Sequence, residues 1–508
     1  MTRNYLDILA ETIRNNWDQP ALTDFYLTED GKAQDTSRGN HYTYGEMYEE
    51  IVHVADLLTN LGLQKGDHIA ICGANSSHWV IAYLAIAKMQ GVSVTIMHSL
   101  QPDEIARLVD FSDAKALFVD KDLWEDLHRP ILGDISFVIA LDDWSVLRGK
   151  QIKNQKSKIK NRECGFDPIE PDTLAMICFT SGSSGNPKGV MLSKRNLDNN
   201  VQNGIEAYPE DSNPDFLCVL PMSHMYGLMI EILSQIVRGK HIWIMKVTPR
   251  IDDIWEGMMR VRPYAMAIIP AIMEGLYTKY CKQIIVNFGF CKQIHIGGAS
   301  FSHNLTKELR QQGLPLSIGY GLTETGPLIS DSQSKEYRLL SCGKIVEGMT
   351  CRIAPTGEIL VKGENVMLGY YKNPEATAQK IDKDGWLHTG DKGHLDEDGY
   401  LYVEGRLEHD IIVLPNGENI RPDNIEHLID ALPEVKESIV LARDGKLVAI
   451  AVSEDAISNQ QSVVSLRRNI LRTVNPQLPL FSQLYDVEIT GQPLQRTEKQ
   501  TIKRYLYK

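Results

Sequence analysis

The chain has 508 residues, of which 43% are hydrophobic and 23% are charged, an ordinary balance for a globular protein. At about 150 residues per domain, this length predicts two to four domains. The formal net charge of −13 argues against nucleic acid as the main partner, because a phosphate backbone requires a basic protein face. It does not exclude an anionic small ligand, which responds mainly to local hydrogen-bond donors.

Cysteine usage and hydropathy give expectations about the compartment. The eight cysteines are scattered without a closely spaced CxxC pair, which favours a reduced, cytoplasmic protein over a disulfide framework or a zinc site. We expect no signal peptide, because residues 1–16 are charged throughout, and no transmembrane segment, because the most apolar stretch, 79–97, contains Lys88, Gln90 and Gly91. The basic stretch 150–162 predicts a surface loop, with peripheral contact to anionic lipid as the alternative.

Helical and strand patterns alternate through most of the chain. Helical periodicity covers residues 5–16 and 43–62, the second with Thr43 as a cap and Glu46 three residues later. Further helices are expected from residue 76 and at 102–111, and strands at 68–72, 92–97, 116–119, 216–220, 241–245, 265–269, 293–296 and 316–318. This alternation predicts an α/β fold with a mainly parallel, doubly wound sheet.

The pattern changes after residue 343. Short β runs at 350–354, 359–362 and 400–404 alternate with turns, which predicts an antiparallel or barrel-like unit. After Arg406, a hairpin at 416–417, helices at 422–431 and 462–473, and strands at 438–441, 447–452 and 485–490 indicate a small α+β domain. We therefore predict an N-terminal domain over 1–406 and a C-terminal domain over 407–508.

A glycine- and serine-rich motif follows the apolar strand pattern at 174–179. It reads Thr180, Ser181, Gly182, Ser183, Ser184, Gly185, Asn186, Pro187, Lys188, Gly189. Glycines let backbone N–H groups converge on a phosphate, hydroxyls add donors and Lys188 adds positive charge. The spacing is not that of a Walker loop, because a second β-like run follows Lys188 before Ser193 can cap a helix. The alternative is a flexible hairpin tip; four hydroxyls, a proline and a lysine in this order favour phosphate contact.

A second motif, residues 319–326, directly follows the strand pattern at 316–318. Glycines allow a sharp turn at a strand end, where ligands of α/β sheets bind. Tyr320 offers a flat face for a purine, Thr323 a phosphate donor and Glu324 a hard oxygen for Mg²⁺. The alternative is a tight turn with an exposed glutamate.

Two further positions are candidates for ribose contact. Asp391 follows Thr389-Gly390 and could accept both ribose hydroxyls, although an Asp in a turn usually caps backbone. Arg406 lies at the predicted domain junction, where an interface salt bridge is the alternative.

Together with the segment 221–224, which ends in His224, and with Gly297-Gly298-Ala299, these motifs resemble the adenylate-forming superfamily of acyl-CoA synthetases, peptide-synthetase adenylation domains and luciferases. The run from Gly357 to Tyr371 and on to Asp391 looks most like bacterial long-chain fatty acid–CoA ligases. The resemblance implies a large N-terminal domain, a mobile C-terminal domain and two half-reactions. A carboxylate first attacks the α-phosphate of ATP, and a thiol, expected to be that of CoA, then displaces AMP.

The resemblance also implies roles for single residues. Thr180, Ser181, Ser183, Lys188 and Gly189 would hold the β- and γ-phosphates, within a loop that also contains Gly182, Ser184 and Gly185. Gly298 and Tyr320 would flank adenine, and the neighbouring Ala299 and Gly321 would also belong to the nucleotide site. Thr323 would bind the α-phosphate, Glu324 would hold Mg²⁺, and Asp391 and Arg406 would take the ribose. His224 would lie near the carboxylate; a satisfied core histidine is the alternative.

Two positions depart from the family pattern. The hinge position holds Glu408, and the place of the C-terminal catalytic lysine holds Thr501. If residues 499–503 are extended, alternate residues face one side, so Lys499 or Lys503 could supply the ammonium, and we favour Lys499.

The sequence therefore predicts an AMP-forming acid–thiol ligase for a fatty or other apolar acid, using ATP, Mg²⁺ and CoA. The alternatives are a ligase that loads an acyl-carrier protein or an aryl acid, and a nucleotide-binding regulator with impaired catalysis.

Overall fold

The structure is a computed structural model that describes residues 4–25, 40–127, 135–150, 159, 162–180, 187–208, 214–246, 250–287, 290–298, 301, 303–332, 338–406, 412–413, 419–420, 422–443, 446–453, 460–478, 482–496 and 502–507. The chain divides into two compact units. The first contains Met1–Thr389 with Gly393–Val403, and the second contains Gly390–Lys392 with Glu404–Lys508.

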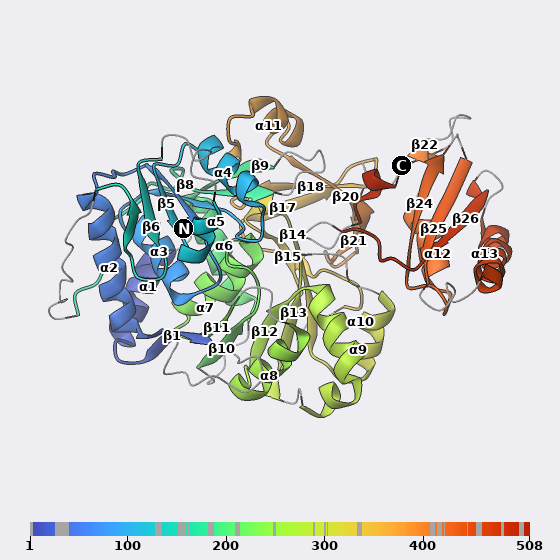
Figure 1. The fold of residues 1–508 in the computed structure, drawn as a ribbon, viewed down its shortest axis with the longest axis horizontal. Helices are drawn as coiled ribbons and strands as arrows, with labels where there is room; N and C mark the ends of the chain where they lie inside the picture. Colours follow the sequence, from blue (N-terminus) through green and yellow to red (C-terminus); the bar gives the residue numbers. More distant parts are fainter. Residues whose placement is uncertain are drawn as a thin grey trace. The chain divides into compact units, whose positions relative to one another are not determined.

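An eight-stranded sheet organises the first unit, in the order β19-β9-β8-β4-β3-β5-β6-β7 (Figure 1). Its strands are β3 (His68–Cys72), β4 (Val92–Thr95), β5 (Ala116–Val119), β6 (Phe137–Ala140), β7 (Val146–Arg148), β8 (Leu174–Thr180), β9 (Lys188–Ser193) and β19 (Gly369–Tyr370). The central strands pair in parallel, whereas β7, β9 and β19 pair antiparallel at the two ends. The β4 and β5 strands are buried at every position, as expected for parallel strands covered on both faces.

Three smaller sheets complete this part of the chain. A five-stranded sheet has the order β12-β13-β14-β15-β16, and a four-stranded sheet has the order β10-β11-β1-β2. Their strands are β1 (Pro20–Phe25), β2 (His41–Thr43), β10 (Asp215–Cys218), β11 (His241–Met245), β12 (Ala265–Ile268), β13 (Gln293–Ile296), β14 (Leu316–Gly321), β15 (Leu328–Asp331) and β16 (Lys344–Ile345). The third sheet, β17-β18-β20-β21, consists of β17 (Met349–Ile353), β18 (Glu358–Gly363), β20 (Leu387–Leu395) and β21 (Leu401–Arg406).

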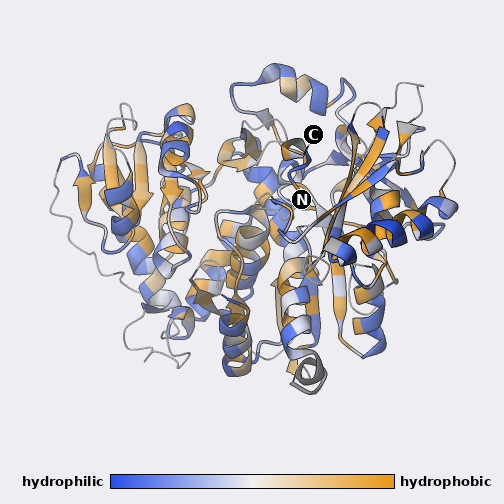
Figure 2. Ribbon diagram, turned by 45° about the vertical axis from the view of Figure 1, so that its right-hand side comes forward, coloured by the Kyte–Doolittle hydropathy of each residue, from blue (hydrophilic) through white to orange (hydrophobic). Residues whose placement is uncertain are grey.

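Helices cover these sheets, and most of them are amphipathic, although the helix Ser77–Lys88 is buried on all sides from Ser77 to Ile86. They are α1 (Tyr5–Asn15), α2 (Tyr44–Asn60), α3 (Ser77–Lys88), α4 (Pro102–Phe111), α5 (Lys121–Asp126), α6 (Lys194–Glu206), the π-helix η3 (Gly227–Leu233), α7 (Ser234–Val237), α8 (Ile251–Val261), α9 (Pro270–Asn287), α10 (His303–Gln311), the 3-10 turn η5 (Thr323–Thr325) and α11 (Pro374–Lys380). Helices α8, α9 and α10 gather beside β12 and β13 in Figure 1. Many helices are striped blue and orange in Figure 2, whereas most strands are mainly orange, so the apolar side chains concentrate between the layers.

The second unit has its own apolar core. A three-stranded sheet, β24-β25-β26, packs with α12 and α13 around buried residues that include Ile425, Ile429 and Ile470. The elements are the pair β22 (Ile412–Val413) and β23 (Asn419–Ile420), α12 (Pro422–Asp430), β24 (Glu437–Arg443), β25 (Lys446–Val452), α13 (Gln460–Val474), the 3-10 turns η8 (Asn475–Gln477) and η10 (Arg504–Leu506), and β26 (Asp486–Thr490). Its own core is what an independently folding α+β domain requires.

The α/β class, with a large N-terminal part and a small C-terminal part, is confirmed, and the predicted boundary at 406 stays a prediction. The capping box at Thr43 is present, because its hydroxyl accepts from Glu46 N while the Glu46 carboxylate accepts from Thr43 N. One local prediction is wrong. The β14 strand does not turn at Gly319 but continues to Gly321, because Gly319 and Tyr320 pair with Asp331 and Ser330 of β15. The basic stretch 150–162 lies mostly outside the described residues.

Candidate functional site

The strand pair β8–β9 frames the glycine- and serine-rich motif. Thr180 ends β8 and pairs with Lys188, the first residue of β9, so the loop between them begins and ends at one point of the sheet. Thr180 is buried and Lys188 is half-buried. Ser193, at the end of β9, caps α6 by accepting from Asn196 N, as predicted. Lys188 therefore lies where the loop rejoins the paired strands β8 and β9.

The second motif forms a tight bend after β14. Leu322 N donates to Pro327 O at 3.0 Å and to Thr325 Oγ1 at 3.1 Å, which closes the turn around η5. Asn200 of α6 holds this bend from outside: its Nδ2 donates to Thr325 O at 3.0 Å and its Oδ1 accepts from Leu328 N at 2.9 Å. Because α6 directly follows β9, Asn200 joins the two motifs. The role of Asn200 was not predictable from the local sequence, because its partners Thr325 and Leu328 are distant in sequence.

Strand β19 brings the two motifs together. Tyr370 pairs with Val190 of β9, and its hydroxyl donates to Glu324 Oε1 at 2.7 Å. The Lys188 Nζ lies 5.0 Å from the centre of the Tyr370 ring. In addition, Met367 N donates to Glu324 O at 2.9 Å. Lys188 of the first motif and the Glu324 carboxylate of the second therefore contact the same tyrosine, one at its ring and the other at its hydroxyl.

The segment before His224 is fixed beside β8. Asn75 accepts from Met222 N at 2.9 Å and donates to Leu220 O at 2.8 Å. The Cys178 thiol, in β8, lies 3.8 Å from Ser223 O. His224 is half-buried, and its Nδ1 accepts from Tyr226 N at 3.2 Å. The structure therefore brings the His224 segment next to the strand that carries Thr180.

Tyr226 links this segment to the glycine turn after β13. Its hydroxyl donates to His295 O at 3.2 Å, and a Cβ at Gly297 would meet the Tyr226 ring at 3.1 Å. Gly298 has φ +84°, a conformation that favours glycine, and it is exposed. A side chain at Gly297 would therefore collide with the tyrosine, so the two glycines allow a close approach at this position.

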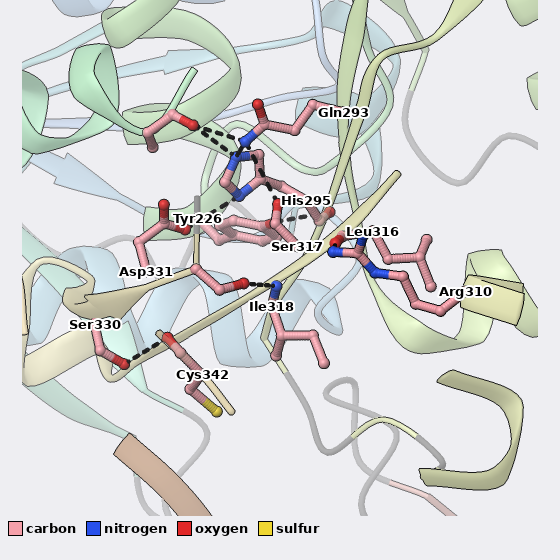
Figure 3. A network of polar contacts seen from close by, with 12 residues as sticks. Tyr226, Gln293, His295, Arg310, Leu316, Ser317, Ile318, Ser330, Asp331 and Cys342 are labelled. Atoms are coloured by element: carbon pink, nitrogen blue, oxygen red, sulfur yellow. Dashed lines mark hydrogen bonds and ion pairs between the residues drawn. The ribbon is translucent and has the colours of Figure 1, made fainter. Parts of the chain in front are cut away.

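A buried polar network surrounds His295 of β13, the strand that precedes the Gly297-Gly298 turn (Figure 3). His295 Nδ1 lies 3.2 Å from Asp331 Oδ1, and His295 Nε2 lies 3.1 Å from Ala207 O. Asp331 pairs with Gly319 of β14, directly before Tyr320. The network thus joins β13, β14 and β15 next to the backbone of Tyr320, and its polar groups help to specify the register of these strands.

A buried carboxylate also binds the chain just before the His224 segment, at residues 219 and 220. Glu231 lies within the π-helix η3 and accepts from Leu220 N at 2.8 Å and from Val219 N at 3.2 Å. Its burial raises the pKa of this carboxyl to about 8. π-Helical turns are uncommon and often occur at functional sites. Glu231 is not among the residues predicted above, although its sequence signal is a single acidic residue within the apolar run 225–233.

This pKa predicts a pH-dependent stability. The folded state binds a proton at Glu231 that the unfolded state releases above about pH 4.5, so stability falls as pH rises from about 4.5 to 8, by at most about 5 kcal/mol. Glu231→Gln removes this titration and keeps an acceptor oxygen. We expect its melting temperature to be close to that of the unsubstituted protein at pH 5 and several degrees above it at pH 9, measured by calorimetry. If the melting temperatures of the two proteins differed by the same amount at every pH from 5 to 9, the raised pKa of Glu231 would be contradicted.

The other predicted site residues are placed as follows. Thr323 is buried in η5, and Gly321 ends β14. Asp391 is buried in β20 and Arg406 ends β21, both within the second unit. Lys503 is half-buried in the second unit. Seven predicted residues lie outside the described residues: Ser181, Gly182, Ser183, Ser184, Gly185, Ala299 and Lys499. The predicted hinge, Glu408, and Thr501 also lie outside them, so all these roles stay predictions.

The described residues do not form a dedicated metal cage. They contain no group of three or more His, Cys, Asp or Glu side chains that could hold a metal ion. Glu324 alone fits the way in which Mg²⁺ is usually bound, by one or two carboxylates together with substrate phosphates and water. None of the cysteines with described side chains forms a disulfide bond. Within the described part of the chain, no helix is long and apolar enough to cross a membrane.

Comparison with protein families matches both parts of the chain. Residues 9–371 match the AMP-binding enzyme model, and residues 409–507 match the AMP-binding enzyme C-terminal domain. The chain belongs to the AMP-binding enzyme family. This membership confirms the coarser part of the resemblance that the motifs indicated, while the specificity for long-chain fatty acids stays a prediction.

Similar AMP-binding enzymes among curated proteins are CoA ligases by name. The chain is 27% identical over 486 residues to 4-coumarate–CoA ligase 3 of Arabidopsis thaliana, which covers 89% of this chain and 83% of that protein. It is 27% identical over 436 residues to indoleacetate–CoA ligase of Aromatoleum aromaticum, covering 82% and 83%. It is 25% identical over 428 residues to peroxisomal OPC-8:0-CoA ligase 1 of Arabidopsis thaliana, covering 80% and 77%.

Solved structures show the same fold across the whole chain. ATP-bound MatB from Rhodopseudomonas palustris superposes with a TM-score of 0.80 at 22% identity, covering 99% of this chain and 98% of that one. The o-succinylbenzoate CoA synthetase of Bacillus subtilis, solved with its acyl-adenylate intermediate, gives a TM-score of 0.80, 22% identity and the same coverages.

Proposed function

We propose that this AMP-binding enzyme is an AMP-forming acid–thiol ligase. It activates an apolar carboxylic acid as an acyl adenylate, releases pyrophosphate, and transfers the acyl group to CoA. The observation that carries the proposal is the convergence of Lys188 and Glu324 on Tyr370, since a phosphate-binding cation and a Mg²⁺ ligand are required at one place. The names of the relatives, all CoA ligases, support the acceptor.

The proposed chemistry is positioning and charge neutralisation. A carboxylate must attack the α-phosphate of ATP, so two anions approach each other and cations with aligned donors lower the barrier. Lys188 and Thr180 bind the terminal phosphates, Thr323 donates to the α-phosphate, and Tyr320 stacks on adenine. Glu324 would hold Mg²⁺, which neutralises phosphate charge when bound. Asp391 and Arg406 hold the ribose. The acyl chain lies near His224 and the Gly297-Gly298 turn.

The side chains around that turn favour an apolar acid. Tyr226 packs against Gly297, a Cβ at Gly298 would lie 3.4 Å from Ile269 Cγ2, and the nearby Phe301 and Met225 are buried. Apolar side chains of this kind are what an alkyl chain or an aromatic ring of the acid would pack against. The fatty acid expected from sequence and the aryl acids suggested by the relatives' names are both within this class.

ATP–pyrophosphate exchange across a panel of acids tests the proposal. We expect exchange with at least one medium-chain aliphatic, arylalkanoic or hydroxycinnamic acid, and none with short polar acids. Addition of CoA should convert the exchanging acid to a thioester, detected by mass spectrometry. Tight ATP binding without exchange for any acid would instead identify a nucleotide-binding regulator. Exchange without CoA acylation would indicate a carrier-protein acceptor.

A further inference from the structure

Tyr370 occupies a position that its backbone fixes from two sides. Strand β19 pairs with β9 through Gly369 and Met191 and through Tyr370 and Val190. On the other side, Tyr370 N donates to Thr377 Oγ1 at 2.9 Å, and Gly369 has φ +140° with a Cβ position only 2.7 Å from Thr377 Cγ2. A side chain at position 369 would therefore collide with the Thr377 side chain of α11, which accepts the hydrogen bond from Tyr370 N. The Tyr370 ring is therefore held, with only 4% of the residue exposed.

From this position Tyr370 contacts both charged groups of the site. Its hydroxyl donates to Glu324 Oε1 at 2.7 Å, a charge-assisted hydrogen bond that orients the carboxylate. Its ring face lies 5.0 Å from Lys188 Nζ, within the range of a cation–π contact. The two contacts use different parts of the same side chain.

Tyr370 gives Lys188 and Glu324 each a contact that does not depend on the opposite charge of the other. A lysine and a glutamate at one site attract each other, and an ion pair between them would have to break whenever a phosphate and a cation bound. The tyrosine ring attracts the ammonium without a counter-charge, and the hydroxyl satisfies one carboxylate oxygen while leaving the group anionic. Lys188 can then bind a phosphate, and Glu324 a cation, without an ion pair between the two side chains having to break first.

We propose that Tyr370 is a positioning residue that holds Glu324 for the nucleotide-bound cation and Lys188 for the phosphates. This inference rests on the proposed function for the identity of those ligands. It predicts that the hydroxyl affects the response to Mg²⁺, whereas the ring affects the response to ATP.

Tyr370→Phe and Tyr370→Leu separate the two contacts. Tyr370→Phe keeps the ring and removes the hydroxyl, so we expect the Mg²⁺ concentration for half-maximal exchange to rise about fivefold to tenfold. The KM for ATP at saturating Mg²⁺ should stay within about twofold. Tyr370→Leu removes both contacts and should also raise the KM for ATP by about fivefold. An unchanged Mg²⁺ requirement in Tyr370→Phe would overturn the proposal.

The next residue supplies a matched control. The Tyr371 hydroxyl donates to Asp113 Oδ2 at 2.6 Å, the same kind of bond at an exposed carboxylate of another loop. Tyr371→Phe should leave the Mg²⁺ requirement unchanged, and an equal shift in both variants would overturn the proposal. Calorimetric titration with ATP at several Mg²⁺ concentrations repeats the comparison without acid. A shift there in Tyr370→Phe supports the positioning role even if no acid in the panel is activated, which would count against the ligase function alone.

Discussion

Glu324→Gln is expected to lower ATP–pyrophosphate exchange by a factor of about 10² to 10³, the usual cost of removing one electrostatic stabiliser of a transition state. Glutamine keeps the shape and can still accept from the Tyr370 hydroxyl, but it is neutral and a poor ligand for Mg²⁺. The loss should therefore appear in the exchange rate and in the Mg²⁺ requirement, both measured with the best acid of the panel. The melting temperature should change little, because the side chain is only half-buried and glutamine has the same shape.

Glu375→Gln is the matched control for this charge removal. Glu375 is exposed in the first turn of α11, close in sequence to Tyr370 but outside the proposed site. Its substitution should leave exchange within about twofold, because surface charges at a helix N-terminus affect stability slightly. Exchange by Glu324→Gln at more than a fifth of the unsubstituted rate, with the same Mg²⁺ requirement, would contradict the assigned role.

Local patterns predicted the elements whose partners are close in sequence. The strand at 68–72 and the helix at 102–111 have the predicted bounds, because a short apolar run and an amphipathic stretch beginning at Pro102 are each sufficient signals. The Thr43 capping box was visible for the same reason: its two partners are three residues apart. These features need no knowledge of the remaining chain.

Features that depend on distant pairing were missed or wrong. Glycines at 319 and 321 are compatible with a turn or a strand, and pairing with β15 decides for the strand. Tyr370 was seen only as part of a family-like run, because its role requires both the β19–β9 pairing and the bend at Glu324. The charged motifs themselves were predictable, since chemistry restricts which residue types can bind phosphate, but the residue that connects them was not.

The contacts of the C-terminal segment bear on which lysine could replace the catalytic lysine that the family pattern expects at Thr501. Arg504 forms a bidentate ion pair with Glu426, at 2.6 Å and 2.5 Å. Ile502 bridges to Arg496, and Lys503 N donates to Gln495 O at 2.8 Å. These contacts fix Lys503 immediately before the 3-10 turn η10, so its position is set by the core of the second unit. Lys499 lies outside the described residues.

Separate Lys499→Ala and Lys503→Ala substitutions test which ammonium serves adenylation in place of Thr501. We expect Lys499→Ala to reduce pyrophosphate exchange about 100-fold, since a cation that neutralises developing phosphate charge acts only in this half-reaction. Conversion of a supplied acyl adenylate to the thioester should stay within about threefold. Lys503→Ala should keep most of the exchange, because the ammonium is assigned to Lys499 and the variant retains the backbone bond to Gln495 and the Arg504–Glu426 ion pair that hold this segment. A 100-fold loss in Lys503→Ala instead would reassign the role to that residue. If both variants exchange at the unsubstituted rate, neither lysine replaces the one expected at position 501, and the displaced-lysine hypothesis is wrong.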